Sequence, residues 1–401
     1  MPPVARAVPA DRPAVLHEAR LLATLSATLF LTITNINMLA PLLVDLAAEF
    51  HTSVGSMGQV VAVSAVPWAI VAPFMGALSD RYGRKQVLAG GVAGLGLITA
   101  LSAFTWSYGS LFAFRLLGTV PGATTGPNLM SGPANYFPPH RQGQAGGIIL
   151  LGISLATVMG VPMVAAASAY FGWRMAFAGE GVLLILLAGA IWQTVPRAGK
   201  EEEKVGVMSG LAAALRERST RFLLLANALE RISFNAVGTY LAAFLMQSYG
   251  LRLEHAAPVL SAIAMGTLLG ALLGGRLADR GRQALQYVGF EAVAAGLALF
   301  LFATQPGVLS TSLVAAAFGI SSSMARPAWL WLMNRVPPSV RTTTMGFAST
   351  TNQIGIVGGA AIGGALVGAG SYSLVGVLAC TAAIAGAAAC FVGGRSLRAT
   401  Q

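Results

Sequence analysis

Long runs of uncharged, apolar residues fill this chain from residue 21 to residue 394. Several of them exceed the roughly 20 residues that a helix, rising 1.5 Å per residue, needs to cross the hydrocarbon core of a bilayer. Only 10% of the residues are charged and 55% are hydrophobic, whereas a soluble domain carries roughly 25% charged residues. The sequence therefore predicts an all-α protein that crosses a membrane many times, and it argues against a soluble enzyme.

Charged or Pro/Gly-rich breaks divide the apolar sequence into twelve predicted transmembrane helices. We expect them at residues 21–44, 57–79, 87–107, 109–131, 143–169, 175–196, 221–247, 256–277, 284–304, 308–334, 344–368 and 372–394. The longest break holds a Lys-Glu-Glu-Glu-Lys run, and it separates six spans from six. We therefore predict an N-terminal six-helix bundle (1–196), a cytoplasmic linker (197–220) and a C-terminal six-helix bundle (221–401).

The basic residues predict how the helices are oriented. If the N-terminus is cytoplasmic, 20 of the 25 lysines and arginines fall in cytoplasmic segments, and the outer loops hold only Arg174 and Arg252. Such a bias is typical of multi-pass membrane proteins and predicts that both termini are cytoplasmic. The same bias accounts for the net charge of +11, so we expect no nucleic-acid partner. The expected partner of the helices is the lipid bilayer.

The two predicted bundles repeat one another at a single offset. The string Gly-Ala-Leu-Ser-Asp-Arg-Tyr-Gly-Arg-Lys at 76–85 recurs in weaker form as Gly-Arg-Leu-Ala-Asp-Arg-Gly-Arg at 275–282, 199 residues later. A Pro-Pro pair before Arg141 recurs before Arg341, at an offset of 199 to 200 residues. Two features that share one offset indicate a duplicated six-helix unit.

The motif at 76–85, between the second and third predicted spans, resembles the signature loop of the major facilitator superfamily. With its weaker copy, the Phe-Gly-Trp-Arg string at 171–174 and Arg115 in the fourth span, the chain resembles the twelve-helix drug:proton antiporter branch. The sequence departs from that branch at two places. Arg115 is followed by Gly118 and Thr119 rather than Gln and Gly, and the fifth span holds Gly160-Val-Pro162 without a glycine pair.

The resemblance implies two pseudo-symmetric six-helix bundles that rock around a central site in the inner membrane. We expect a monomeric secondary transporter that exports small organic compounds in exchange for protons. Alternatives are a proton-coupled importer or a uniporter of a small metabolite, and a membrane receptor that does not transport. The Gly83-Arg-Lys sequence lacks the spacer of a nucleotide-binding loop, and we expect no cofactor, no metal and no enzymatic activity.

The resemblance further implies a cytoplasmic gate at the repeated motif. A carboxylate at Asp80 would meet the positive N-terminal end of the eleventh helix, near Thr342 to Thr344, and Asp279 would act likewise at the start of the fifth helix. The predicted gate residues are Gly76, Asp80, Arg81, Gly83, Arg84, Asp279, Arg280 and Arg341. The alternative is that the basic residues of the motif only enforce topology.

Six ionisable residues fall inside predicted spans, where an isolated charge costs ~2.5 to 3.5 kcal/mol on insertion scales. They are Glu180, Glu230, Glu291, Arg115, Arg231 and Arg326. The family places helices 1, 4, 7 and 10 around the cavity, which implies a proton-coupling or substrate site formed by Asn35, Asn37, Arg115, Glu230, Arg231, Asn235 and Arg326.

Glu230 and Arg326 lie at similar predicted depths, so the two side chains can be partners. Glu230 is therefore either a proton or substrate site or a permanent structural partner of an arginine. For Arg115 an anchor for an anionic substrate and a structural role are equally open. Glu291 lies on a helix that the family places outside the cavity, and we expect it to be structural.

Overall fold

A computed structural model describes residues 12–71, 75–138, 141–196, 215–278, 281–305 and 307–399. The described residues form helices joined by short turns, and no strand occurs among them. The N-terminal half contains α1 (Arg12–Asn37), η1 (Ala40–Leu42), α2 (Leu43–Glu49), α3 (Val54–Val71), α4 (Met75–Tyr82), α5 (Arg84–Ser102), α6 (Tyr108–Gly122), α7 (Thr125–Tyr136), α8 (Gln142–Leu155), η3 (Ala156–Gly160), α9 (Val161–Phe171) and α10 (Trp173–Thr194). The C-terminal half contains α12 (Arg218–Tyr249), α13 (Leu253–Ala278), α14 (Gln283–Thr304), α15 (Val308–Met333), α16 (Pro338–Gly368) and α17 (Tyr372–Ala399).

Nine helices in the described part of the chain are long and apolar enough to cross a bilayer. The fourth, seventh and eleventh predicted spans are not among these nine. They correspond to α6 with α7, to α12 and to α16, and the last two carry polar stretches such as Glu230-Arg231 and Thr351-Asn352-Gln353. Helices that line a polar interior can have low mean hydropathy and still span a membrane.

The first span, predicted as one helix over 21–44, ends as α1 at Asn37 and is followed by η1 and α2. Two further differences from the sequence prediction have clear physical reasons. The fourth span, predicted as one helix over 109–131, is interrupted between Gly122 and Thr125, next to Pro121, which cannot donate a backbone hydrogen bond. The eleventh helix begins at Pro338 rather than at residue 344, because proline is well suited to the first turn of a helix.

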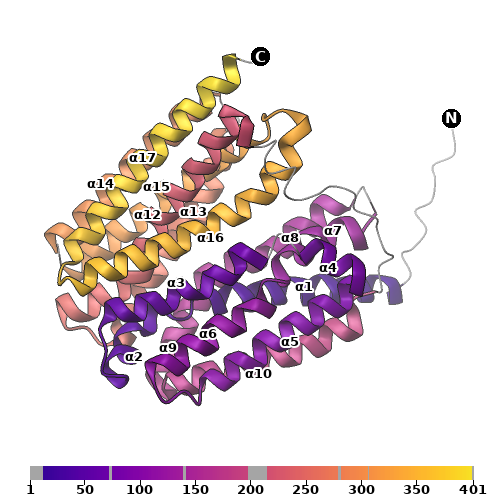
Figure 1. Cartoon of the computed structure of the whole chain (residues 1–401), viewed down its shortest axis with the longest axis horizontal. Helices are drawn as coiled ribbons and strands as arrows, with labels where there is room; N and C mark the ends of the chain where they lie inside the picture. Colours follow the sequence, from indigo (N-terminus) through magenta and orange to yellow (C-terminus); the bar gives the residue numbers. More distant parts are fainter. Residues whose placement is uncertain are drawn as a thin grey trace.

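The molecule consists of two helical bundles that lie side by side (Figure 1). In one, α5 packs against α10 and α6, and α1 packs against α8. In the other, α12 packs against α16 and α17, α14 against α15 and α17, and α13 against α15. The bundles meet where α3 lies along α16, and where η3 and α9 contact α13.

Close contacts between the bundles lie toward the end of the molecule away from the two termini, which we call the distal end. A β-carbon added to Gly55 on α3 would lie 2.3 Å from the carbonyl oxygen of Gly364 on α16. Nearby, Gln59 Nε2 donates to the carbonyl of Ala361 at 3.0 Å. Gly58 lies against the hydroxyl of the buried Tyr240, which donates to the carbonyl of Ala360 at 2.5 Å. Backbone contact through glycine therefore holds the distal end closed.

Candidate functional site

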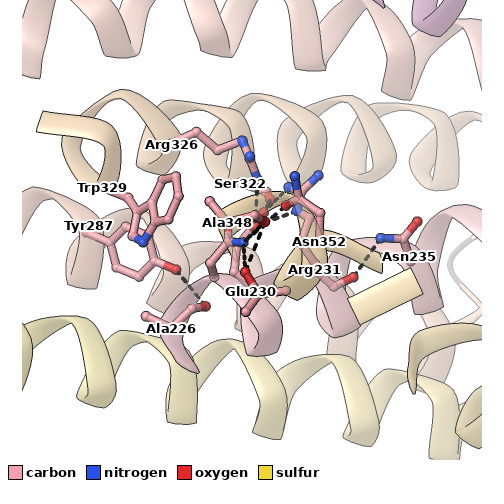
Figure 2. Close-up of polar contacts among 12 residues, drawn as sticks. Ala226, Glu230, Arg231, Asn235, Tyr287, Ser322, Arg326, Trp329, Ala348 and Asn352 are labelled. Carbon is pink, nitrogen blue, oxygen red and sulfur yellow. Dashed lines mark hydrogen bonds and ion pairs between the residues drawn. The ribbon is translucent and has the colours of Figure 1, made fainter. Parts of the chain in front are cut away.

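A cluster of buried charges occupies the middle of the C-terminal bundle, with Glu230 of α12 at its centre (Figure 2). Arg326 Nη1 on α15 donates to Glu230 Oε2 at 3.0 Å, and Ser322 Oγ one turn before it donates to Oε1 at 3.2 Å. The neighbouring Arg231 adds a two-point contact, with its Nε 2.6 Å from Oε2 and its Nη2 bonded to Oε1. The carboxylate thus accepts four hydrogen bonds, three of them from guanidinium groups.

Burial explains why this carboxylate needs so many donors. Only 2% of the Glu230 side chain is exposed, and an ionised carboxylate removed from water is tolerated when it is paired and hydrogen-bonded. Arg231 is held in place from the other side, because its guanidinium lies over the ring of Phe234 at 4.7 Å. Two arginines therefore hold the carboxylate in place. One of them, Arg326, has 33% of its side chain exposed.

A second acid, Glu291 of α14, adjoins this cluster. It is 1% exposed, and its charge interacts with those of Glu230, Arg231 and Arg326. Its Oε1 has no hydrogen-bond partner among the described residues. Between them, the four groups carry two negative and two positive charges when all are ionised. The sequence predicts a structural Glu291 on a helix outside the cavity, and the structure places its charge beside the predicted site residues; its role stays a prediction.

An apolar cavity of about 370 Å³ lies between the bundles and reaches the cluster. Arg326 is the charged residue among the described residues that line it. The walls come from α8 and η3 on one side and from α13 and α15 on the other: Ile153, Val158, Ala264, Thr267, Leu268, Ala271, Ser323, Arg326, Pro327, Trp329 and Leu330. One guanidinium therefore faces a space whose other walls are mainly hydrocarbon and indole.

The other predicted arginine, Arg115 of α6, lies in a separate cluster in the N-terminal bundle. It is 3% exposed, with Nη2 donating to the carbonyl of Asn35 at 2.9 Å and Nε to Ser64 Oγ at 3.3 Å. Asn35 of α1 donates in turn to Thr99 Oγ1 of α5 at 3.0 Å. The network joins α1, α3, α5 and α6, so it holds helices of one bundle together.

Glu180 of α10 supplies the negative charge of this second cluster. It is 6% exposed and interacts electrostatically with Arg115, whose guanidinium lies 5.9 Å from the ring of Phe177 on the same helix as Glu180. The Asn35 amide, which donates to Thr99, also lies beside the Glu180 carboxylate. Each bundle thus contains at least one buried acid close to an arginine.

The remaining predicted site residues join neither cluster. Asn37 Nδ2 donates to the carbonyl of Ile33 at 2.9 Å, and Asn235 Nδ2 donates to that of Arg231 at 2.8 Å. Both amides therefore bond to the preceding turn of their own helices. No group of three His, Cys, Asp or Glu side chains that could hold a metal occurs in the described part of the chain.

The predicted gate is described only in part. Gly76 lies in α4, Gly83 separates α4 from α5 with φ +89°, a conformation that favours glycine, and Arg84 begins α5. The Arg81 guanidinium lies over the ring of Tyr82 at 5.3 Å. Asp279 and Arg280 lie outside the described residues, as do the side chains of Asp80 and Arg341, so their role in a gate stays a prediction.

Three functional contacts were missed in the sequence. Ser322 bonds Glu230, Ser64 bonds Arg115, and Thr99 bonds Asn35. Serine and threonine occur throughout transmembrane helices as small packing residues, so nothing in the sequence distinguishes Ser64 or Thr99. Ser322 could have been found only by its position one turn from Arg326 on the same helix face.

A family comparison now identifies the class of protein. Residues 25–360 match the model of the Major Facilitator Superfamily, and the chain belongs to this superfamily. It is a multi-pass membrane protein of a family of transporters, with the two-bundle fold of that superfamily.

Individual relatives have different described roles. The chain is 28% identical over 278 residues to a chloramphenicol resistance protein of Streptomyces lividans, with 68% of this chain and 71% of that protein covered. It is 27% identical over 324 residues to a 3-(3-hydroxy-phenyl)propionate transporter of Escherichia coli K12, with 79% and 78% covered.

A solved structure shares the fold. A bacterial homologue of the human lysosomal transporter Spinster, crystallised in an inward-facing, unoccupied conformation, superimposes with a TM-score of 0.77 at 18% sequence identity. The alignment covers 98% of this chain and 99% of that chain.

Proposed function

We propose that this protein is a proton-coupled secondary transporter of small organic compounds in the inner membrane, working by alternating access as a monomer. One observation carries the proposal: a buried, charge-balanced cluster reaches an apolar cavity between the two bundles through Arg326. Charges at membrane depth mark substrate and ion pathways more often than they serve stability alone.

The positions of the two bundles support alternating access. Glycine contacts close the distal end around Gly55 and Gly58, and the cavity at Arg326 lies between the bundles. If both termini are cytoplasmic, as the basic residues predict, the distal end is the outer face. The state described here then has its outer side closed, and transport requires the α3–α16 contact to open.

Export in exchange for protons is the first candidate for the direction, as in the drug:proton antiporter branch. The relative named as a chloramphenicol resistance protein is in keeping with it. Uptake together with protons is the second candidate. The relative named as a 3-(3-hydroxy-phenyl)propionate transporter handles a carboxylate, and the cavity of this chain presents an arginine that can bind one.

Proteoliposome flux tests the proposal. Purified protein is reconstituted with an imposed pH gradient, and the movement of labelled drugs and aromatic acids is recorded together with the internal pH. Antiport predicts that substrate and protons cross in opposite directions, and co-transport predicts the same direction. Substrate that equilibrates without a pH change would indicate a uniporter, and a complete absence of flux across the panel would indicate a receptor.

A further inference from the structure

We infer that the cavity at Arg326 binds a small organic anion with an apolar body, and that a proton enters the Glu230–Glu291 cluster with it. This inference rests on the proposed transport function and names its substrate class. It is carried by three features of the site: the composition of the cavity wall, the unused donors of Arg326 and the charge balance of the cluster.

The cavity wall is suited to an amphipathic anion. Its volume of about 370 Å³ lies within the roughly 300 to 1,000 Å³ of small-molecule pockets. Leu268, Leu330 and Trp329 give it an apolar surface, and Arg326 gives it one positive charge. A neutral apolar molecule would leave the remaining N–H donors of Arg326 without an acceptor, and a cation would be placed next to a guanidinium. An aromatic or aliphatic carboxylate satisfies both parts of the wall.

Arg326 has donors left to bind such an anion. A guanidinium offers five N–H donors, and Arg326 uses one in its hydrogen bond to Glu230, among the residues that the structure describes. Arg231, by contrast, is committed to Glu230 through two atoms and is only 16% exposed. Glu230 is therefore neutralised mainly by Arg231, and Arg326 can face the cavity.

Charge balance links the anion to a proton. Glu230 and Glu291 offset Arg231 and Arg326 when all four are ionised, so the cluster has no net charge to attract an anion. One proton on a carboxylate gives the cluster a net charge of +1, which a bound monoanion cancels. Proton and anion therefore bind with positive cooperativity, and each raises the affinity for the other by the same factor.

Geometry assigns this proton to Glu291. Both oxygens of Glu230 accept hydrogen bonds, whereas Glu291 Oε1 has no partner in the described residues. The titratable and charged groups around Glu291 are Glu230 and Arg231 from α12, Arg326 from α15, Cys390 from α17 and Tyr287 from its own helix. Because proton and anion move together, this arrangement favours co-transport over antiport.

Equilibrium binding to the purified full chain tests the inference. Benzoate, 3-phenylpropionate and benzenesulfonate are titrated beside neutral benzamide and cationic benzylamine, by calorimetry at several pH values. Benzenesulfonate stays ionised throughout, so any change in its affinity with pH comes from the protein. We expect the anions to bind more tightly than benzamide or benzylamine, and the affinity for benzenesulfonate to fall as pH rises.

Substitutions distinguish the anion-binding role of Arg326 from the proton-binding role of Glu291. Arg326→Gln should weaken anion binding at least about tenfold, while Arg326→Lys retains part of it. Arg252→Gln is the matched control, because its side chain is 78% exposed, pairs with Glu254 and lies outside the cavity, and it should leave binding unchanged. Glu291→Gln mimics the protonated acid, so anion affinity should stay high and lose its pH dependence.

Several results would overturn the inference. It fails if no anion binds, if benzamide binds as well as benzoate, or if Arg326→Gln binds the anions normally. The proton assignment fails if the affinity of the wild type for benzenesulfonate is independent of pH, or if Glu291→Gln keeps the pH dependence. These measurements need no transport, so flux of an uncharged compound without anion binding would contradict this inference and leave the proposed transport function standing.

Discussion

Replacing Glu230 with glutamine should destabilise the protein far more than replacing its partner Arg326. Glu230→Gln removes the negative charge shared by two guanidinium groups, and it leaves Arg231 and Arg326 side by side in a site where their side chains are 16% and 33% exposed. Breaking a buried ion pair by removing one partner costs ~3 to 5 kcal/mol, because the remaining charge stays buried. We expect the lower part of this range, since Arg326 is partly exposed.

The reverse change has a smaller cost. In Arg326→Gln, the Glu230 carboxylate keeps its two-point contact with Arg231 and its bond from Ser322, so we expect a loss of about 1.5 kcal/mol, the low end for a hydrogen bond to a charged group. The double variant should be more stable than Glu230→Gln alone, because it removes one of the two guanidinium groups that have lost their shared carboxylate. Coupling between the two positions should lie within roughly 0.5 to 3 kcal/mol.

Unfolding of the purified protein by a denaturing detergent, followed by helix content, measures these differences. Glu18→Gln is the matched control: Glu18 pairs with Arg141 at 2.7 Å, but their side chains are 32% and 47% exposed, and exposed pairs contribute about 0 to 1 kcal/mol. The reasoning is refuted if Glu230→Gln is as stable as Glu18→Gln, or if Arg326→Gln is the more damaging of the two cluster variants.

Three further predictions concern the bundles and the gate. Gly55→Ala should separate the distal ends of α3 and α16, because its β-carbon would meet backbone atoms of Gly364 and Gly368. Spin-label distances across the distal end should then lengthen. Gly90→Ala is the control and should leave these distances unchanged, because its β-carbon would meet nothing within 4 Å. Arg115→Gln should cost about 3 to 5 kcal/mol by leaving Glu180 as a buried charge, with Glu180→Gln in addition restoring part of the stability; equal stability of the single and double variants in the same unfolding assay would show that the two charges do not interact. Asp80→Asn should reduce flux at normal expression by weakening attraction to a helix N-terminus, and unchanged flux with unchanged labelling of cysteines near the start of α16 would count against the predicted gate.

The apolar runs of the sequence predicted the fold well, because a bilayer leaves a spanning chain little choice but a helix. At two places where the sequence prediction differs from the structure, the cause is local: the fourth span is interrupted beside Pro121, and α16 begins at Pro338. Neither apolar periodicity nor length carries information about such turns. The two-bundle arrangement was predicted from the repeated motif, because the repeat indicates that a six-helix unit was duplicated.

The pairing of buried charges was harder to predict. Glu230 and Arg326 lie at matching depths on their helices, and the structure joins them at 3.0 Å. The depth of a residue along its helix did not predict that Arg115 lies near Glu180, or that Glu291 lies near the C-terminal cluster. These contacts depend on which helix packs against which and on how each helix is rotated about its axis. A single sequence records the position of a residue along its helix but not its neighbours across the bundle.

The π-helical turn η3, between α8 and α9, links the cavity to the packing between the two bundles. Residues five apart on a regular α-helix point about 140° apart, whereas a π turn, with its i→i+5 bonding, brings such residues toward one face. Ile153 of α8 and Val158 of η3 both line the cavity. If η3 tightened into α-helix, α9 would turn by about 100° relative to α8, and its contact with α13 would have to change. A ligand that favours one form of this turn would therefore alter the packing between the bundles without touching their glycine contact.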